Sequence, residues 1–385
     1  MKKIVIASFM VLSASLFAQE DISTTVNIPN AEKYKFTTVV DIEASEVKSQ
    51  GKTGTCWSYS TSSFIESEIF RNTGKHIDIS EMYTVRNTYP KKAWNYVMRQ
   101  GKIQFSEGGL AHDVMQSVQG YGLVPESAYT GLLNGATKHD HSKIVPQLKE
   151  VLDIYIKNDK DATVPNWKVA VDSILDASLG KVTNKFFFEG VMYTPKSFLA
   201  LTKIDANDYI TLTSFTHQPY NTQFVLNIPD NFSNGIFYNV ELNSLVDVMN
   251  IALKKGYSIA LDCDVSEKTF SGKYGIAVSP NNVLENKIAL EYIVTEKDIS
   301  VNYRQDEYEN YNTTDDHLMH VVGILKDQRG TTYYKVKNSW GSDSKRIGNG
   351  GYIYMSEAYF RLKTISILLH KNGIPKDLKK KLNIS

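Results

Sequence analysis

The sequence predicts an α+β fold in which a helical N-terminal part and a β-rich C-terminal part enclose a large, mainly helical insert. Apolar residues recur at helical spacing in the first third of the chain and again from residue 144 onward. Short runs rich in β-branched and aromatic residues dominate the last third, between residues 257 and 369. A chain of 385 residues without an internal repeat is long enough for two or three domains.

Residues 1–18 have the pattern of an export signal. Lys2 and Lys3 precede an apolar run over residues 4–14, and Ala18 is a small residue at which a signal peptidase can cut. This run is too short to span a bilayer, and no other segment reaches about 18 consecutive apolar residues. We therefore expect a soluble exported protein, periplasmic or secreted; the alternative is a retained N-terminal anchor. An extended arm is expected to follow over residues 19–45.

Residues 46–130 predict a helical lobe. One helix is expected from about Cys56 to Asn72 and a second over residues 80–99. Pro90 should break or kink the second helix, because proline removes a backbone donor and its ring clashes with the preceding turn. A third helix is expected over residues 111–120.

Residues 131–250 predict an insert that is mainly helical, and residues 251–372 predict a β-rich lobe. Within the insert, apolar spacing favours helices at 144–155 and 167–179, residues 209–215 resemble a strand, and Pro229-Asp230-Asn231 predicts a turn. The strands expected in the β-rich lobe are 259–265, 321–325, 333–336, 352–355 and 365–369. The tail, residues 373–385, reads as a solvated basic end.

Composition narrows the classes of partner. Forty-three basic residues against 42 acidic ones give a net charge of +1, which offers no overall field to hold nucleic acid or an anionic membrane. The two cysteines could form one disulfide, but Cys56 lies in a Gly-rich stretch that opens a helix and Cys263 in an apolar run. We expect one reactive and one packed thiol. The histidines show no zinc pattern with the cysteines, so we expect neither a metal nor an organic cofactor.

The expected helix start at Cys56 favours a reactive thiol. A thiol attacks a carbonyl group as the thiolate, and a helix N-terminus and a neighbouring imidazolium both stabilise that charge. The partner must be a histidine distant in sequence, held by a third group, with donors aimed at the oxyanion. The sequence offers such groups in three places, at Gln50, at Asp316-His317 and at Asn338-Ser339-Trp340-Gly341.

Two of these groups would act directly on the substrate. Gln50 precedes Cys56 in a loop that could place its side-chain amide beside the backbone N–H of Cys56. His317 opens a strand-like run and is the expected base. His320 is the alternative, but residues three apart in a strand point to opposite faces, and only His317 follows an aspartate. We expect His320 to be a core or interface imidazole.

The third group would hold the histidine. Asn338 follows the next strand-like run, where its side chain could accept a hydrogen bond from the ring of His317. Trp340 could shield that bond from water. The alternative for Asn338 is an ordinary turn residue.

These blocks resemble those of the papain-like cysteine peptidases. The spacing from Gln50 to Cys56-Trp57, the spacing from His317 to Gly323 and the Asn338-Ser339-Trp340-Gly341 run match that family's three signature blocks in its order of Cys, His and Asn. Within the superfamily the likeness is to the bleomycin hydrolase and aminopeptidase C branch. It covers most of residues 46–372, with supporting stretches at 80–83, 105–109, 121–126, 194–198, 212–218 and 263–265.

Departures from papain itself favour the same branch. His317 and Asn338 lie much further along the chain from Cys56 than the about 130 to 150 residues that separate these positions in the papain pattern. The bleomycin hydrolase branch also has an insert, which accounts for the additional residues. Thr53 stands where papain relatives usually have another cysteine. Too few residues precede Gln50 for an inhibitory pro-region.

The resemblance implies a papain-like two-lobed fold, with a Cys56–His317 ion pair and a lowered thiol pKa. Gly108, Gly109 and Trp340 would bind the substrate, and the two glycines would let its backbone pair in extended form; the alternative for the glycines is an ordinary turn. In this branch the C-terminal arm lies in the active-site cleft, where its carboxylate meets the substrate's amino group inside a hexameric ring. The basic tail here differs from that arm.

We therefore expect an exported cysteine peptidase that acts on peptides through Cys56, His317, Asn338 and Gln50, with aminopeptidase activity and a homo-hexamer implied by the resemblance. The alternatives are a papain-like endopeptidase, another thiol amide hydrolase, or a non-catalytic binding protein on the same scaffold.

Overall fold

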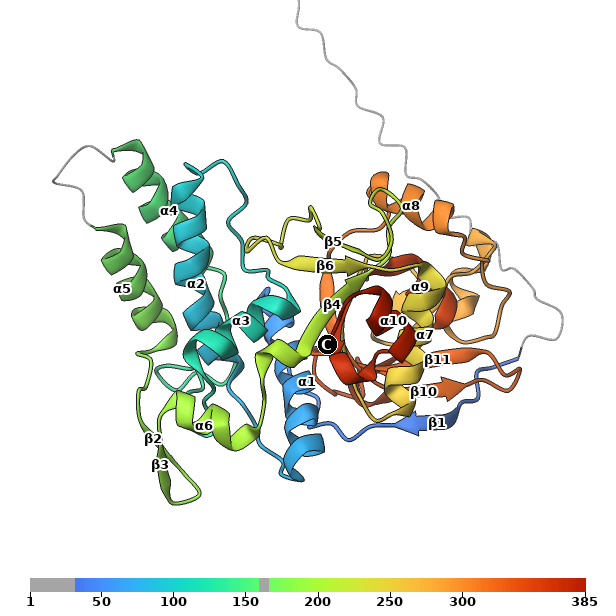
Figure 1. Ribbon diagram of the computed structural model, residues 1–385, viewed down its shortest axis with the longest axis horizontal. Coiled ribbons are helices and arrows are strands. Elements are labelled where there is room, and N and C mark those ends of the chain that lie inside the picture. The colour runs from blue at the N-terminus through green and yellow to red at the C-terminus, as the bar shows by residue number, and fades with distance from the viewer. Residues whose placement is uncertain (1–31, 159–165) are drawn as a thin grey trace, which may run out of the picture.

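The computed structural model describes residues 32–158 and 166–385 and shows an α+β fold (Figure 1). Helices α1 to α6 lie on one side of the molecule, and most of a large sheet lies on the other, together with α7 to α10. The expected export signal and the first part of the expected arm lie outside the described residues. The fold class predicted from the sequence is confirmed.

The N-terminal helices form where the sequence predicts them. Helix α1 spans Cys56–Thr73, α2 spans Glu81–Met98 and α3 spans Ala111–Tyr121. Pro90 was expected to break or kink α2. The helix runs through Pro90 without interruption, so the break is wrong, while the kink stays a prediction. The neighbouring side chains of Tyr89 and Ala93 are fully buried, so packing on both sides of the proline offsets the lost backbone hydrogen bond.

The middle of the chain is partly β-structure. Helices α4 (Ile144–Lys157), α5 (Trp167–Leu179) and α6 (Pro195–Thr202) pack into the same core as α1 to α3. The strands of this segment are β2 (Phe186–Phe188), β3 (Val191–Tyr193), β4 (Tyr209–Thr213), β5 (Thr222–Val225) and β6 (Ile236–Asn239). Strand β4 joins the large sheet, and α7 (Leu242–Lys254) crosses the boundary expected at residue 250.

The large sheet runs in the order β5-β6-β4-β13-β7-β10-β11-β12-β9-β8, and β1 also pairs with β10. Its other strands are β1 (Thr37–Asp41), β7 (Ile259–Cys263), β8 (Phe270–Ser271), β9 (Ile276–Ala277), β10 (His317–Lys326), β11 (Thr332–Lys337), β12 (Tyr352–Ser356) and β13 (Thr364–His370). Strands β7 and β10 are antiparallel, with His317 opposite Cys263 and Leu318 opposite Asp262.

The remaining helices lie in the C-terminal third. They are α8 (Val301–Glu309), α9 (Glu357–Lys363) and α10 (Lys376–Lys381). Single turns of 3₁₀ helix occur at Glu126–Ala128, Ala206–Asp208, Val283–Glu285, Ile288–Leu290, Asn349–Gly351 and Lys371–Gly373. A second core cluster lies between the sheet and helices α7, α9 and α10.

The N-terminal arm packs directly on the strand that begins with His317. Strand β1 pairs antiparallel with the second half of β10. Gly323 lies at this crossing, and a Cβ atom on it would come within 2.4 Å of the carbonyl oxygen of Val40. Glycine is therefore required there, because any side chain would push the arm away from β10.

The tail is part of the core. Leu378 and Leu382 are buried in the second cluster, and Gly373 packs against Ala252 of α7. The expectation of a solvated end holds only for the polar side chains of the tail, such as Lys376, Asp377 and Lys380. Strand β13 leads into the tail beside the C-terminal half of α1, where Tyr209 contacts both Glu68 and His370. The tail thus begins far from the N-terminus of α1.

Among the described residues, no helix combines the length and the apolar character needed to cross a membrane.

Leu382→Ala should lower the free energy of unfolding by about 2 to 4 kcal/mol, because it leaves a cavity between α10 and α7. Chemical denaturation of the purified protein measures this change. The control, Lys380→Ala on the exposed side of the same helix, should change it by less than about 0.5 kcal/mol. Equal effects of the two substitutions would show that α10 does not pack as described.

Candidate active site

The first turn of α1 holds Cys56 against β10. Cys56 is the first residue of the helix and only 8% of its surface is exposed. Helix α1 packs along β10, and the backbone N–H of Leu318 donates a hydrogen bond to the Cys56 sulfur. Because Leu318 follows His317 directly, this contact brings the thiol beside the start of the strand that carries the expected base.

His317 and Asn338 lie together as the sequence predicts. The ring Nε2 of His317 is 2.8 Å from Asn338 Oδ1, and both residues are buried. The ring of Trp340 lies over that of His317, with centroids 5.0 Å apart and planes tilted by 30°. Strand β10 provides the histidine, and the turn after β11 provides the other two residues. The indole therefore covers the histidine ring beside its hydrogen bond to Asn338.

Gln50 is tied to the same group through Ser339. The hydroxyl of Ser339 donates to Gln50 Oε1 over 2.6 Å, and the Ser339 backbone N–H donates to Asn338 Oδ1 over 2.7 Å. A chain of hydrogen bonds thus runs from Gln50 through Ser339 and Asn338 to His317. The sequence pattern assigned no role to Ser339, although this residue lies inside the Asn338-Ser339-Trp340-Gly341 run.

The amide nitrogen of Gln50 bonds to the loop that leads to Cys56. Its amide Nε2 donates to the carbonyl of Thr53 over 2.6 Å, which uses one of its two N–H groups. The second N–H remains for another acceptor. The backbone N–H of Cys56 also has no intrahelical partner, because it belongs to the first turn of α1.

Burial governs the ionisation of both Cys56 and His317. Burial raises the pKa of the Cys56 thiol to about 12, and the charges of Asp230, Asp315 and Asp262 raise it further. Burial lowers the pKa of His317 to about 4, although its hydrogen bond to Asn338 opposes that shift. The thiol of Cys56 therefore does not have a lowered pKa when it ionises alone, and the lowered pKa implied for the ion pair with His317 stays a prediction. A thiolate and an imidazolium formed together would attract each other, which a single charge here cannot do.

The two alternatives on the neighbouring strands are settled. Cys263 is fully buried, and both cysteines are free thiols, so no disulfide joins them. His320 is also fully buried, where its Nδ1 lies 3.0 Å from the hydroxyl of Ser63 and burial holds its pKa well below the usual value. His320 is a core imidazole, as expected.

Gly108 and Gly109 lie beside the Cys56 turn. A Cβ atom on Gly109 would come within 3.1 Å of the Trp57 ring, so this glycine allows the backbone to pack flat on the indole. A Cβ atom on Gly108 would come within 1.8 Å of the carboxylate of Asp230. The sequence predicted a turn at Asp230 but no role in the site. Substrate binding by Gly108, Gly109 and Trp340 stays a prediction.

A lysine occupies the centre of one carboxylate cluster. The carboxylates of Glu66, Asp78 and Glu81 lie close enough together to hold a metal ion. The ammonium group of Lys48, however, already lies 2.5 Å from Asp78 and 2.8 Å from Glu81. This lysine supplies the positive charge that the cluster requires, so the cluster does not need an ion.

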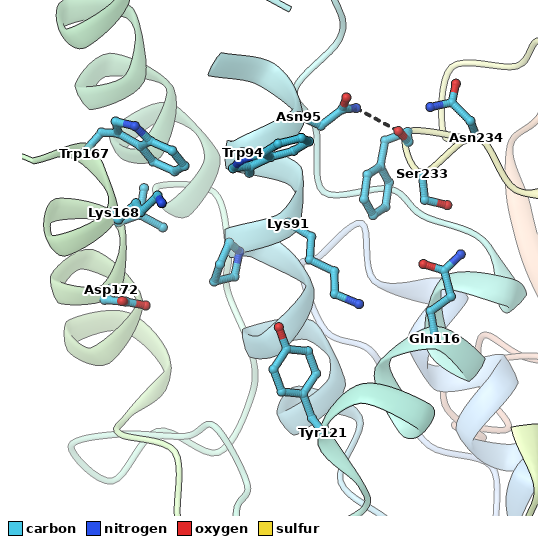
Figure 2. A pocket seen from close by; sticks show the side chains of 13 residues that line it. Lys91, Trp94, Asn95, Gln116, Tyr121, Trp167, Lys168, Asp172, Ser233 and Asn234 are labelled. Carbon is cyan, nitrogen blue, oxygen red and sulfur yellow. Dashed lines mark hydrogen bonds between the residues drawn. The ribbon is translucent and has the colours of Figure 1, made fainter. Parts of the chain in front are cut away.

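A separate cavity of about 590 Å³ lies between α2, α5 and the loop that joins β5 to β6 (Figure 2). Trp94 and Trp167 flank it on the helical side, and Ser233 and Asn234 border it on the loop side. None of the residues expected to carry the chemistry lines this cavity.

Comparisons with known proteins agree with this geometry. Residues 182–385 match the Peptidase C1-like family, and residues 35–197 match the papain family of cysteine proteases. Aminopeptidase C of Listeria monocytogenes is 23% identical over 88% of this chain and 83% of its own, and aminopeptidase C of Lactococcus lactis subsp. cremoris is 22% identical over 86% and 82%. The crystal structure of PepW from Lactobacillus rhamnosis superposes with a TM-score of 0.69 at 19% identity, covering 90% of this chain and 84% of that one.

The match over residues 182–385 covers more than half of the chain. The structural likeness to PepW shows that the fold is papain-like. The chain therefore belongs to the Peptidase C1-like family and is a papain-type cysteine peptidase of the branch that holds the bleomycin hydrolases and the aminopeptidases C.

Proposed function

We propose that this peptidase removes residues from the N-terminus of peptides, with Cys56 as nucleophile and His317 as general acid and base. The observation that carries the chemical part is the hydrogen-bond chain from Gln50 through Ser339 and Asn338 to His317. It joins a donor amide and an imidazole in one hydrogen-bonded unit. Such fixed donors and bases are what acyl transfer to a thiol requires.

The reaction begins with proton transfer from Cys56 to His317. The thiolate attacks the scissile carbonyl carbon, and the carbonyl oxygen becomes an oxyanion that accepts hydrogen bonds from the Cys56 N–H and the free N–H of Gln50. The imidazolium then gives its proton to the leaving amine. Water, deprotonated by His317, attacks the thioester and releases the first residue as an acid. Asn338 keeps the ring oriented throughout.

Aminopeptidase action is supported by the relatives, several of which are named aminopeptidase C. The tail, by contrast, gives no support for the way in which the branch gates its site. Leu378 and Leu382 bind the tail to the second core cluster, and the tail begins beside the C-terminal half of α1. The proposal therefore assigns N-terminal selection to other groups of the chain.

Export is a separate proposal that rests on residues 1–18 alone. The basic start, the apolar run and Ala18 support cleavage by a signal peptidase. N-terminal sequencing of protein recovered from the producing cell would show Gln19 as the first residue if the proposal holds, and Met1 if the segment is retained.

Digestion of a peptide library, followed by mass spectrometry, tests the activity and its end preference together. The protein should shorten peptides stepwise from free N-termini, and Cys56→Ala should abolish this cleavage, since it removes the nucleophile. The matched control Cys263→Ala should keep it, because the Cys263 thiol is fully buried in the second core cluster and cannot meet a substrate. Internal cuts without N-terminal trimming would contradict the aminopeptidase proposal, and full activity of Cys56→Ala would contradict the thiol mechanism.

Ser339→Ala should lower kcat by about 10-fold while changing KM little, because the lost hydrogen bond frees Gln50 Oε1 and loosens the oxyanion donor. Steady-state kinetics on a fluorogenic aminoacyl amide measures both constants. Ser342→Ala, a few residues further on and exposed, is the control and should leave them unchanged. A rise in KM at constant kcat would assign Ser339 to ground-state substrate binding.

A further inference from the structure

The loop between β5 and β6 crosses from the sheet to the helices. Its strands belong to the edge of the large sheet, yet the loop, residues 226–235, contacts α2 and α3. The side-chain amide of Asn95 donates to the carbonyl of Phe232 over 2.7 Å, as Figure 2 shows, and His112 Nε2 lies 3.0 Å from the hydroxyl of Ser233. These bonds hold the loop across the space between the two parts of the molecule.

Asp230, at the turn of this loop, covers Gly108. Its Oδ2 lies where a side chain on Gly108 would begin, and its Oδ1 accepts a hydrogen bond of 3.3 Å from the hydroxyl of Ser106. The backbone face of Gly108 therefore meets a carboxylate. An extended peptide could not continue along that face without displacing the loop.

Two further carboxyl groups face the same region from the sheet. Asp262 lies opposite Leu318 in the β7–β10 pair, and the N–H of Leu318 contacts the Cys56 sulfur. Asp315 precedes His317 by two residues, and its carboxyl group faces both Asp262 and the backbone of Asp230. The charges of all three groups act on the Cys56 sulfur, and Asp230 is the one that lies against Gly108.

None of these carboxyl groups forms an ion pair among the residues that the structure describes. Asp262 is 2% exposed, and apart from each other, Asp262 Oδ1 and Asp315 Oδ2 have no hydrogen-bond partner in the described part of the chain. Burial and the charge of Asp230 raise the pKa of Asp315 to about 7. Burial also raises the pKa of Asp230, although the charge of Lys92, which donates to the carbonyl of Gly108, opposes that shift. Binding a further cation here would favour the ionised carboxylates.

One of the three carboxyl groups borders a cavity. This cavity, of about 460 Å³, lies between the loop, α8 and the segment that leads into β10, and Asp315 forms part of its wall together with Pro229 and Tyr308. A small charged group can therefore reach Asp315 without unfolding the loop.

We propose that Asp230, supported by Asp315 and Asp262, binds the α-ammonium group of the substrate's first residue, while the loop of residues 226–235 closes the path beyond it. This inference rests on the aminopeptidase action proposed above and supplies the group that selects the N-terminus. The α-ammonium is favoured over a lysine side chain because Asp230 occupies the backbone face of Gly108. If the bound ammonium belonged to a lysine that precedes the residue at the scissile bond, the substrate backbone would have to lie along that face, which Asp230 blocks.

The same charges connect substrate binding to the state of the thiol. The carboxylates of Asp230, Asp315 and Asp262 oppose ionisation of Cys56. An ammonium group bound among them cancels part of this field, so the thiolate forms more readily when a free N-terminus is in place. Asp230→Asn permanently removes the charge of Asp230 and should make the thiol more reactive in the absence of substrate.

The test compares one fluorogenic peptide with a free and with an acetylated N-terminus. The wild-type protein should prefer the free form by at least about 100-fold in kcat/KM. Asp230→Asn should lower kcat/KM for the free form about 10- to 100-fold, mainly through KM, since a hydrogen bond between charged groups is lost. The acetylated peptide should be cleaved as fast as before or faster. Asp247→Asn, an exposed position on α7, is the matched control and should change neither value.

The rate at which iodoacetamide alkylates Cys56 provides a second measurement. If Asp230 had only a structural role, its substitution would not raise this rate. The rate at fixed pH should rise several-fold in Asp230→Asn and stay constant in Asp247→Asn. Thermal unfolding shows whether each variant is folded. If Asp230→Asn does not fold, Asp315→Asn replaces it and should likewise reduce the preference for the free N-terminus.

An unchanged preference in folded Asp230→Asn would overturn the inference. The inference would also fail if Asp230→Asn lowered kcat/KM equally for an acetylated peptide that carries lysine before the residue at the scissile bond. The carboxylates would then bind a side chain and not the α-ammonium group. Cleavage that depends on Cys56 but ignores the N-terminus would overturn both the anchor and the aminopeptidase proposal, leaving a thiol peptidase. Cleavage that survives Cys56→Ala would instead overturn the proposed mechanism, which separates the two failures.

Discussion

The packing of α1 against β10 is the constraint on which the site depends. The helix brings Cys56 to the N–H of Leu318, and the strand begins with His317, so one interface sets the position of both groups. Everything else extends from that contact. Strand β11 returns along β10 and ends at Asn338, and the loop before α1 meets the same turn when Ser339 donates to Gln50. Residues from four separate parts of the chain meet because one helix lies on one strand.

The tight packing has an electrostatic consequence. Fully buried groups ionise reluctantly, and here both the thiol and the imidazole are held neutral when each is considered alone. Three carboxyl groups close to the sulfur strengthen this effect for the thiol. The reactivity of the site therefore depends on proton transfer from Cys56 to His317, and the surrounding charge affects how readily this transfer occurs.

Sequence patterns located the candidate side chains better than their surroundings. Cys56, His317 and Asn338 lie in short runs of distinctive residues whose spacing resembles that of a known family, and the structure brings His317 and Asn338 into contact. Periodicity gave helices α1, α3, α4 and α5 with small errors. Asp230 carried only a turn pattern, because its importance arises from contact with Gly108, 122 residues away in the chain. The tail misled for a related reason, since its lysines are conspicuous and the two leucines that bury it are not.

The burial of Cys56 also bears on how the protein withstands oxidants. Only 8% of the residue's surface is exposed, so peroxides have little open sulfur to attack. The packing that positions the thiol beside β10 thus also limits its conversion to a sulfenic acid.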